Sequence, residues 1–422
     1  MRVRTRLALL ASATLVLTAA VPTAASDGAR TLDDVNVIYT LALPGIQFGW
    51  AISELPDVNG DGVTDLIVSD DPGFSGAPGL VYVFSGADGA LLQQHSEGPG
   101  GRLGYAIADA GDVDADGVHD VIAGRPGTST AYVYSGADGN TLLTINRPAS
   151  EHLGVAVARA GDVDGDGHAD LLVGAQNAAI NGADSGRAYV FSGADGSLLH
   201  AMDGAPGDLL GTATDRVPDT TGDGVPEHAV GARDAGKWND GAVELFDGAS
   251  GTRIWSFVGP KEDQDLGLFF VAGLPDLSGD GVPDVYAADF GATINGNQSG
   301  RAYVLSGVDG SVVRIHDGGS AKDGLGPGRE AGDVNGDGVT DLVIGSYGSR
   351  DGVKDGGRFD LFSGADGSVL GSVLGSIPGA ELGFDAVGLG DVDGDGVPDV
   401  AVSAAAGNLV YVVSGASLLT GP

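Results

Sequence analysis

The sequence predicts an all-β fold, a seven-bladed β-propeller of four-stranded antiparallel blades closed by an N-terminal strand. Three observations lead to this prediction: an acidic loop recurs seven times, short apolar runs follow each copy, and 75 glycines but no cysteine occur among 422 residues. Short runs rich in Val, Leu and Tyr between Gly and Asp indicate strands. Glycine at this density, without a three-residue period, indicates many turns.

The acidic loop defines the repeating unit of the chain. Its copies begin 55, 50, 57, 57, 57 and 58 residues apart, which is a period typical of propeller arrays. The copies are DVNGDGVTD from Asp57, DVDADGVHD from Asp112, DVDGDGHAD from Asp162, DTTGDGVPE from Asp219, DLSGDGVPD from Asp276, DVNGDGVTD from Asp333 and DVDGDGVPD from Asp391.

Each unit contains the same segments in the same order. An FG or LG pair precedes the acidic loop. The loop is followed by an apolar run such as DLIVSD, a variable loop, a run such as LVYVFSGADG and a short run such as ALLQQHS. Four strands in each of seven units indicate a propeller, whereas a linear β-solenoid would need a shorter and more uniform period. The pairs are Phe48-Gly49, Leu103-Gly104, Leu153-Gly154, Leu210-Gly211, Leu266-Gly267, Leu325-Gly326 and Leu382-Gly383.

The two ends of the repeat array predict how the ring closes. The last unit ends in SGASLLTGP, which leaves little room for a fourth strand, while residues 36–45, NVIYTLALPG, precede the first FG pair. We expect this N-terminal segment to supply the missing strand of the seventh blade, because closure removes the exposed edges of a split ring. Residues 27–422 are therefore predicted to form a single propeller domain.

Residues 1–26 have the features of a secretory signal peptide. Three arginines precede an apolar run from residue 7 to about residue 20, and small residues follow at 24–26. The apolar run is shorter than the roughly 20 residues that a membrane-spanning helix needs. We expect a secreted protein, extracellular, periplasmic or associated with the cell surface, with no membrane span.

The charge of the chain excludes some partners. With 58 acidic and 21 basic residues, the formal net charge is -37. Nucleic acid and anionic membranes are disfavoured, because binding phosphate requires a basic surface. An exported chain without cysteine has no disulfides to hold its loops, so calcium is the expected substitute. We expect a monomer whose partner is an extracellular protein or a glycan.

The spacing of oxygen-bearing residues predicts one calcium ion per blade and up to seven in all. Side chains at positions 1, 3, 5 and 9, a backbone carbonyl at position 7 and a turn-forming glycine at position 6 make the oxygen-only shell that Ca²⁺ prefers. Without a cation, so many carboxylates in one loop would repel one another. The expected ligands are Asp57, Asn59, Asp61, Val63, Asp65, Asp112, Asp114, Asp116, Val118, Asp120, Asp162, Asp164, Asp166, His168, Asp170, Asp219, Thr221, Asp223, Val225, Glu227, Asp276, Ser278, Asp280, Val282, Asp284, Asp333, Asn335, Asp337, Val339, Asp341, Asp391, Asp393, Asp395, Val397 and Asp399.

Three other interpretations of the loop are weaker. An EF-hand needs a glutamate at position 12, where this chain always has an apolar residue such as Val68. A turn that binds nothing would explain one Asp-Gly pair but not the acids or amides that recur at the other positions. Zinc is disfavoured because there are no cysteines or suitably spaced histidines. Occupancy is least certain in the fourth loop, which carries Thr221 and Glu227.

The repeating unit resembles the FG-GAP repeat of integrin α-chain N-terminal propellers and their bacterial relatives. The resemblance rests on the FG or LG pair, the DxDxDGxxD loop, the apolar strand and the GxVYVFSG-like strand, in this order. The resemblance covers residues 36–418. It implies seven blades, with calcium between the first and second strands of a blade and ligand binding on the opposite face. The chain departs from the pattern in its degenerate GAP element, for example AGRP and VGAQ, and in carrying an acidic loop in every blade.

In the family, the ligand face is built from loops that join the second strand to the third and the fourth strand to the next blade. Here those loops contain aromatic residues next to cations, a combination that suits a binding hot spot. The candidates are Trp238, Lys237, Tyr347, Arg350 and Phe290. We therefore expect a calcium-binding recognition or adhesion module for a protein or glycan.

An enzyme is the alternative interpretation. There is no cysteine nucleophile, GxSxG elbow or HExxH pair, and the seven histidines form no recognisable catalytic pair. A polysaccharide lyase or hydrolase on a propeller scaffold stays open, as does a quinoprotein-like oxidoreductase. Only three tryptophans occur, at non-equivalent positions of the repeat, which counts against the quinoprotein.

Overall fold

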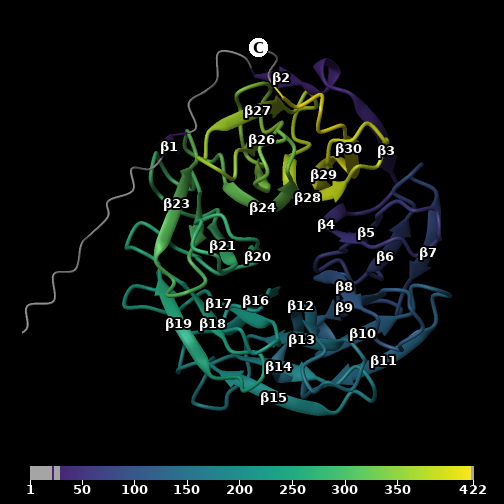
Figure 1. Ribbon diagram of the computed structural model, residues 1–422, viewed down its shortest axis with the longest axis vertical. Helices are drawn as coiled ribbons and strands as arrows, with labels where there is room; N and C mark the ends of the chain where they lie inside the picture. The colour runs from purple at the N-terminus through teal and green to yellow at the C-terminus, as the bar shows by residue number, and fades with distance from the viewer. Residues whose placement is uncertain (1–20, 23–28, 420–422) are drawn as a thin grey trace, which may run out of the picture.

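A computed structural model describes residues 21–22 and 29–419, and it confirms the seven-bladed propeller. Seven antiparallel sheets surround a central axis, and each uses four consecutive strands of one repeat except at the seam of the ring. In every blade the first strand lies nearest the axis and the fourth lies at the rim (Figure 1). The predicted signal peptide falls on residues outside the described ones, apart from Val21–Pro22.

The strands of the first four blades follow the predicted runs closely. They are β4 (Phe48–Leu55), β5 (Asp65–Asp70), β6 (Leu80–Phe84) and β7 (Leu91–His95); β8 (Ile107–Gly111), β9 (Asp120–Arg125), β10 (Thr130–Tyr134) and β11 (Thr141–Asn146); β12 (Leu153–Gly161), β13 (Asp170–Ala175), β14 (Arg187–Phe191) and β15 (Leu198–Asp203); and β16 (Leu210–Val217), β17 (Glu227–Ala232), β18 (Ala242–Phe246) and β19 (Arg253–Val258).

The remaining blades repeat this order. They are β20 (Val271–Leu274), β21 (Asp284–Asp289), β22 (Arg301–Leu305) and β23 (Val312–Asp317); β24 (Leu325–Gly332), β25 (Asp341–Ser346), β26 (Arg358–Phe362) and β27 (Val369–Leu374); and β28 (Leu382–Gly390), β29 (Asp399–Ala404), β30 (Leu409–Val413) and β3 (Val37–Ala42). Short 3-10 turns are η1 (Leu32–Asp34), η2 (Pro126–Thr128), η3 (Ala149–Glu151) and η4 (Ala405–Gly407).

The core lies between neighbouring blades. One buried apolar cluster fills each of the seven blade interfaces, as where Ile122 of the second blade and Tyr189 of the third share a cluster. Second strands such as β13, DLLVGA, are buried at every residue because both faces of the sheet are covered. This explains why these runs are continuously apolar after the first aspartate instead of alternating.

The ring closes as the sequence predicted. Strand β3 pairs antiparallel with β30, with Thr40 opposite Tyr411. The turn beyond β30 is also held by the Ser414 amide, which donates to the Asn36 carbonyl at 2.9 Å. Strand β3 therefore supplies the fourth strand of the seventh blade. Within the described part of the chain, no helix is long and apolar enough to cross a membrane.

The FG or LG pair joins each blade to the preceding one. Leu266 is fully buried and forms a parallel bridge to Gly241 of the fourth blade. Gly267 has φ +82°, and a Cβ atom there would lie 2.3 Å from the carbonyl oxygen of Ala242. The leucine therefore fills the interface, and the glycine permits the close approach of two backbones.

The first strand of the fifth blade is irregular. Nine positions separate Gly267 from Asp276, one more than the eight that separate the corresponding residues Gly49 and Asp57 of the first blade. The additional length is absorbed at Phe269, which has φ +69°, and β20 is only four residues long. A bulky residue in the left-handed region is strained. The irregularity places Phe269 among the side chains that line the axis.

The N-terminal segment also contacts the rim of two blades. Strand β1 (Val21–Pro22) pairs in parallel with β23, and β2 (Arg30–Thr31) pairs in parallel with β27. The Arg30 guanidinium donates to the carbonyl of Ser417 at 2.6 Å, which ties this segment to the C-terminal end of the described chain.

Candidate metal loops and central channel

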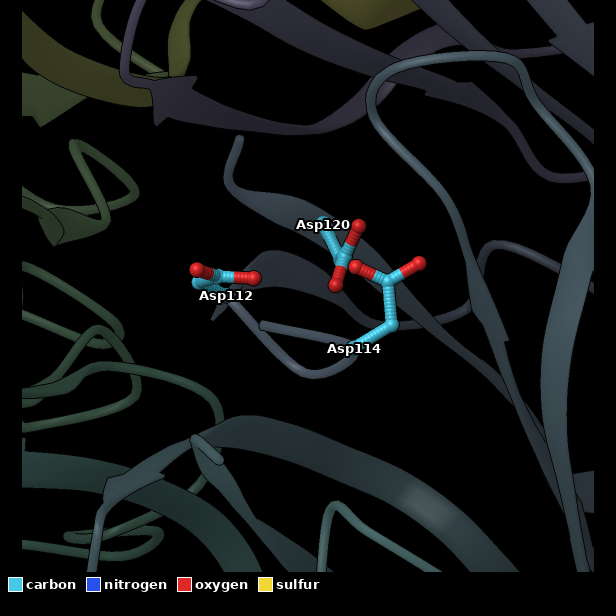
Figure 2. Close-up of side chains that lie close together, drawn as sticks. All are labelled: Asp112, Asp114 and Asp120. Atoms are coloured by element: carbon cyan, nitrogen blue, oxygen red, sulfur yellow. The ribbon is translucent and has the colours of Figure 1, made fainter. Parts of the chain in front are cut away.

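All seven acidic loops lie where the resemblance implies, between the first and second strands of a blade. Residues 112–120, for example, connect β8 to β9. Figure 2 shows Asp112, Asp114 and Asp120 of this loop turned toward one another. One carboxylate oxygen from each lies within 4.8 Å of the others. The same grouping at positions 1, 3 and 9 occurs in the third loop (Asp162, Asp164, Asp170) and the seventh (Asp391, Asp393, Asp399).

Backbone N–H groups orient the carboxylate at position 1. In the first loop, the Asp57 carboxylate accepts hydrogen bonds from the amides of Gly60 at 2.6 Å and Gly62 at 2.7 Å. Desolvation opposes ionisation, but these bonds outweigh it and lower the pKa of Asp57. The pKa values of Asp219 and Asp276 are lowered for the same reason. The loop thus holds this carboxylate charged and in place.

The carboxylate at position 9 is buried and fastens the loop to its blade. Asp120 accepts a hydrogen bond from the Val113 amide at 2.7 Å and another from the Gly136 amide, in the turn between β10 and β11, at 3.0 Å. Burial raises the pKa of Asp120 to about 6, although these bonds act in the opposite direction. A cation at the loop would offset the cost of this buried charge.

The loops differ at position 3, which sets their ligand chemistry. Three carry aspartate there, and the other four carry Asn59, Thr221, Ser278 or Asn335, which are neutral oxygen donors. In the fourth loop the Glu227 carboxylate accepts hydrogen bonds from the amides of Thr220 at 2.7 Å and Thr221 at 3.0 Å. Glu227 thus holds the start of its loop, as Asp120 does through the Val113 amide, despite the longer side chain.

The donor set of these loops fits calcium. Carboxylate, amide, hydroxyl and carbonyl oxygens are the hard ligands that Ca²⁺ takes, and none of the loop positions offers a thiolate. The two loop histidines are engaged elsewhere. The His168 ring bonds the Val113 carbonyl at 2.7 Å, and the His119 ring bonds Asp109 at 2.9 Å.

A channel of about 530 Å³ lies where the first strands of the blades converge. Six partly buried aromatic side chains from five of the blades form a closed ring, which we call the aromatic mouth. Successive ring centroids are 5.8 Å apart for Trp50 and Tyr105, 5.7 Å for Tyr105 and Phe269, 6.4 Å for Phe269 and Phe290, 6.2 Å for Phe290 and Tyr347, 5.7 Å for Tyr347 and Phe384, and 5.4 Å for Phe384 and Trp50.

Charged side chains line the same channel, and we call them the charged band. Glu54 follows Trp50 by four residues, roughly 13 Å along an extended strand. This band was not predicted from the sequence, although a simple signal was available. In the first four blades the fifth residue after the FG or LG glycine is always charged. The band consists of Glu54, Asp109, Arg159, Asp215, Arg216, Arg329, Glu330 and Asp385.

Ion pairs hold much of the charged band. Arg159 pairs with Asp109 at 3.0 Å, and Arg329 pairs with Asp385 at 3.0 Å. Burial raises the pKa of Glu54 to about 7, against the attraction of Arg329. The Oε2 atom of Glu54 is buried and has no hydrogen-bond partner among the described residues. The channel therefore contains a polar atom that no described residue satisfies.

The predicted ligand-face residues separate into two groups. Phe290 and Tyr347 belong to the aromatic mouth. Trp238 is 61% exposed in the loop between β17 and β18, with the Lys237 ammonium 4.7 Å from its ring centroid. Arg350 pairs with Asp355 of its own loop at 2.6 Å. In the described part of the chain no ring contact links Trp238 to the mouth, so the aromatic mouth and the Trp238 loop are distinct surfaces.

Comparison with known families supports the repeat assignment. The family model of the FG-GAP-like repeat matches residues 112–173, which run from the start of the second acidic loop into β13. No curated protein sequence matches the chain. The fold and its loops define a seven-bladed β-propeller, in which residues 112–173 match the FG-GAP-like repeat. The matched repeat and the seven blades together fit an FG-GAP propeller resembling that of integrin α chains.

Proposed function

We propose that the protein is a secreted, calcium-binding propeller that recognises a protein or a glycan. The observation that carries this proposal is the division of the molecule into two ends. Seven oxygen-rich loops join first to second strands at one end, while the aromatic mouth and the long variable loops lie at the FG end of the first strands. Secretion is supported by the leader that the sequence predicts at residues 1–26.

In each blade, calcium would stabilise the loop between the first and second strands. In the second loop Asp112, Asp114, Asp116 and Asp120 would hold the ion together with the Val118 carbonyl. When bound, the ion supplies positive charge to carboxylates that otherwise repel one another. Because the unfolded chain lacks the assembled oxygen shell, binding stabilises the folded state by mass action.

Recognition is supported by the aromatic side chains at the other end. Trp238 and Phe74 are 61% and 97% exposed, and each lies beside a cation, Lys237 or Arg102. Large apolar side chains exposed on loops contribute binding energy when a partner covers them. Rigid blades beneath such loops limit the ordering that binding requires.

Two measurements test this function. Metal analysis of the protein after dialysis against calcium should find several ions per chain, up to seven, and chelation should lower the melting temperature. A screen of the calcium-loaded protein against extracellular proteins and glycans should then find a saturable ligand. Unchanged melting together with no bound metal would show that the loops are only turns and would contradict the proposal.

A second function, an enzyme that cleaves a glycan, is favoured by one observation. The carboxyl group of Glu54, with a pKa raised by burial to about 7, lies in a channel that also holds Asp385 and Arg329. A carboxyl group with a pKa near neutrality suits general acid–base catalysis. Release of reducing ends from a polysaccharide by the purified protein, abolished by Glu54→Gln, would establish this function over pure recognition.

A further inference from the structure

We propose that the central channel is a binding site for a neutral carbohydrate, a mono- or disaccharide unit that packs against the aromatic mouth and is held by the charged band. This inference deepens the proposed recognition function, because it names the ligand class and moves the site from the surface loops to the axis. It is carried by the shape of the channel, by its polar composition and by two buried polar atoms without partners.

The dimensions of the channel suit a small ligand. Its volume of about 530 Å³ lies within the range of sites that enclose small molecules. The first strands of adjacent blades form its walls, so the lining is rigid. Phe269 is held at φ +69° by the additional residue of the fifth blade. Backbone strain in a bulky residue is often found at ligand-binding positions.

The aromatic mouth offers flat apolar surfaces. The C–H face of a pyranose ring packs against such surfaces, since both are apolar and of similar size. The indole of Trp50 is fixed by a hydrogen bond from its Nε1 atom to the Tyr105 carbonyl at 3.0 Å. In the third and fourth blades the residues equivalent to Trp50 are Val155 and Thr212, which are smaller, so the aromatic lining is confined to one side.

The charged band favours a neutral polyol over an ion. Five carboxylates and three guanidinium groups line the channel. Carboxylates accept hydrogen bonds and guanidinium groups donate them, whereas a sugar hydroxyl does both. Ion pairs such as Arg159–Asp109 and Arg329–Asp385 already neutralise much of this charge, whereas the hydroxyl groups of a sugar can hydrogen-bond to both kinds of group.

Two polar atoms in the channel lack partners within the described residues. The Oε2 atom of Glu54 and the hydroxyl of Thr214 are both buried without a hydrogen bond, and Thr214 is only 8% exposed. Leaving buried polar groups unsatisfied costs free energy, which a bound hydroxyl group would recover. Glu54 lies in the first blade and Thr214 in the fourth, so one ligand between them would contact different walls of the channel.

Calorimetric titration of the full-length, calcium-loaded protein with neutral sugars tests the proposal. The probes are glucose, galactose, mannose, N-acetylglucosamine, cellobiose and maltose, with glucuronate and choline as charged comparators. We expect saturable millimolar or tighter binding of at least one neutral sugar, and weaker binding of both comparators. Comparing the affinity for a free monosaccharide with the affinity for an oligosaccharide that ends in the same sugar shows which form the channel binds, a free sugar or the end of a glycan chain. Binding of either one supports the site.

Two conservative variants locate the site. Glu54→Gln and Thr214→Val should each weaken sugar binding about tenfold, and Thr214→Val should leave the melting temperature unchanged or raised, because it removes an unsatisfied hydroxyl. The matched controls Glu262→Gln and Thr144→Val, both at exposed positions, should bind like the wild type. Trp50→Leu, checked for folding by its melting curve, should also weaken binding.

Several results would overturn the proposal. These are the absence of saturable binding of any neutral sugar, tighter binding of glucuronate or choline, or binding that survives both channel variants but is lost in Trp238→Ala. Failure here is distinguishable from failure of the proposed function. Bound calcium and a protein ligand without sugar binding would contradict only the channel site. If the protein binds sugar but metal analysis finds no calcium after dialysis against calcium, only the proposed calcium sites are contradicted.

Discussion

Arg329 and Asp385 connect the three blades that meet where the ring closes. Arg329 of the sixth blade donates to the Asp385 carboxylate of the seventh blade at 3.0 Å and to the Ile52 carbonyl of the first blade at 3.0 Å. Asp385 in turn accepts a hydrogen bond from the Ile52 amide at 3.0 Å. One ion pair on the channel wall therefore reinforces the closure that β3 makes at the rim.

Removing one partner of this pair should destabilise the whole ring. Asp385→Ala removes the carboxylate that hydrogen-bonds to the largely buried Arg329 guanidinium, and we expect the free energy of unfolding to fall by about 3 kcal/mol. Urea unfolding in calcium measures the change. The control Asp355→Asn breaks the exposed Arg350–Asp355 pair and should cost no more than about 0.5 kcal/mol. Equal effects of the two variants would contradict the role assigned to Asp385.

Loss of a single loop ligand should remove a single calcium ion. Asp114→Ala takes a carboxylate from the second loop, so metal analysis should find one ion fewer and the melting temperature should fall in calcium. Asp114→Asn keeps an oxygen at position 3, as Asn59 does in the first loop, and should retain the ion. With calcium at 100 times its dissociation constant, one site contributes about 2.7 kcal/mol. Identical metal content in both variants and the wild type would disprove this assignment.

Buried neutral histidine should make the protein sensitive to acid. Burial lowers the pKa of His316 to about 3, and its ring lies 4.3 Å from that of Phe362. Since the unfolded chain binds this proton near pH 6.5 and the folded chain does not, stability is present above pH 6.5 and is lost as the pH falls toward 3. At pH 5 the loss is about 2 kcal/mol for this one group.

The variant His316→Leu should therefore lose less stability between pH 8 and pH 5 than the wild type. Unfolding is measured in urea with chelator present at both pH values, so that protonation of the metal loops does not contribute through calcium release. His152→Asn, at an exposed position where the backbone has φ +53°, is the control and should behave like the wild type. If His316→Leu and the wild type lose the same stability between pH 8 and pH 5, His316 is not the acid-sensitive group.

Replacing two glycines by alanine can distinguish the steric cost of a Cβ atom between two blades from the cost of a left-handed backbone conformation. Gly267 and Gly207 have φ +82° and +89°, but a Cβ at Gly267 meets a carbonyl at 2.3 Å while a Cβ at Gly207 meets nothing within 4 Å. Gly207→Ala should cost about 1 kcal/mol from the left-handed conformation alone. Gly267→Ala should cost at least about 2 kcal/mol more, measured by chemical unfolding, because two blades must move apart. Equal costs would mean that the blade interface adapts easily.

The local parts of the fold were predictable because their signals lie close together in the sequence. The acidic loops, the strands that follow them and the closing strand at residues 36–45 were all predicted, and the structure places them as expected. The loops and strands depend on turn-forming glycines and aspartates next to apolar runs, which act over fewer than ten residues. Repetition made the signal stronger, since one motif recurs in every blade.

The central channel was not predicted, because its lining comes from seven separate repeats. Phe290 and Tyr347 were identified only as candidates on separate loops, and the structure joins them in one ring with Trp50, Tyr105 and Phe384. The residue directly after the FG or LG glycine lines the channel in six blades, and in the fifth blade the next residue, Phe269, does so. Its neighbours there, however, come from blades that are distant in sequence.

The sequence by itself determined the seven repeats and the acidic loops, because backbone conformation and hydrophobic patterning are local properties. It also indicated how the ring closes, because the last repeat lacks a fourth strand that residues 36–45 can supply. Only the tertiary structure decided which side chains meet at the axis, as Arg329 meets Asp385 and Ile52 across three blades. The physical reason is that closure brings the first strands of all seven blades together, so burial, pKa shifts and unsatisfied groups such as the Glu54 carboxyl arise from packing between repeats.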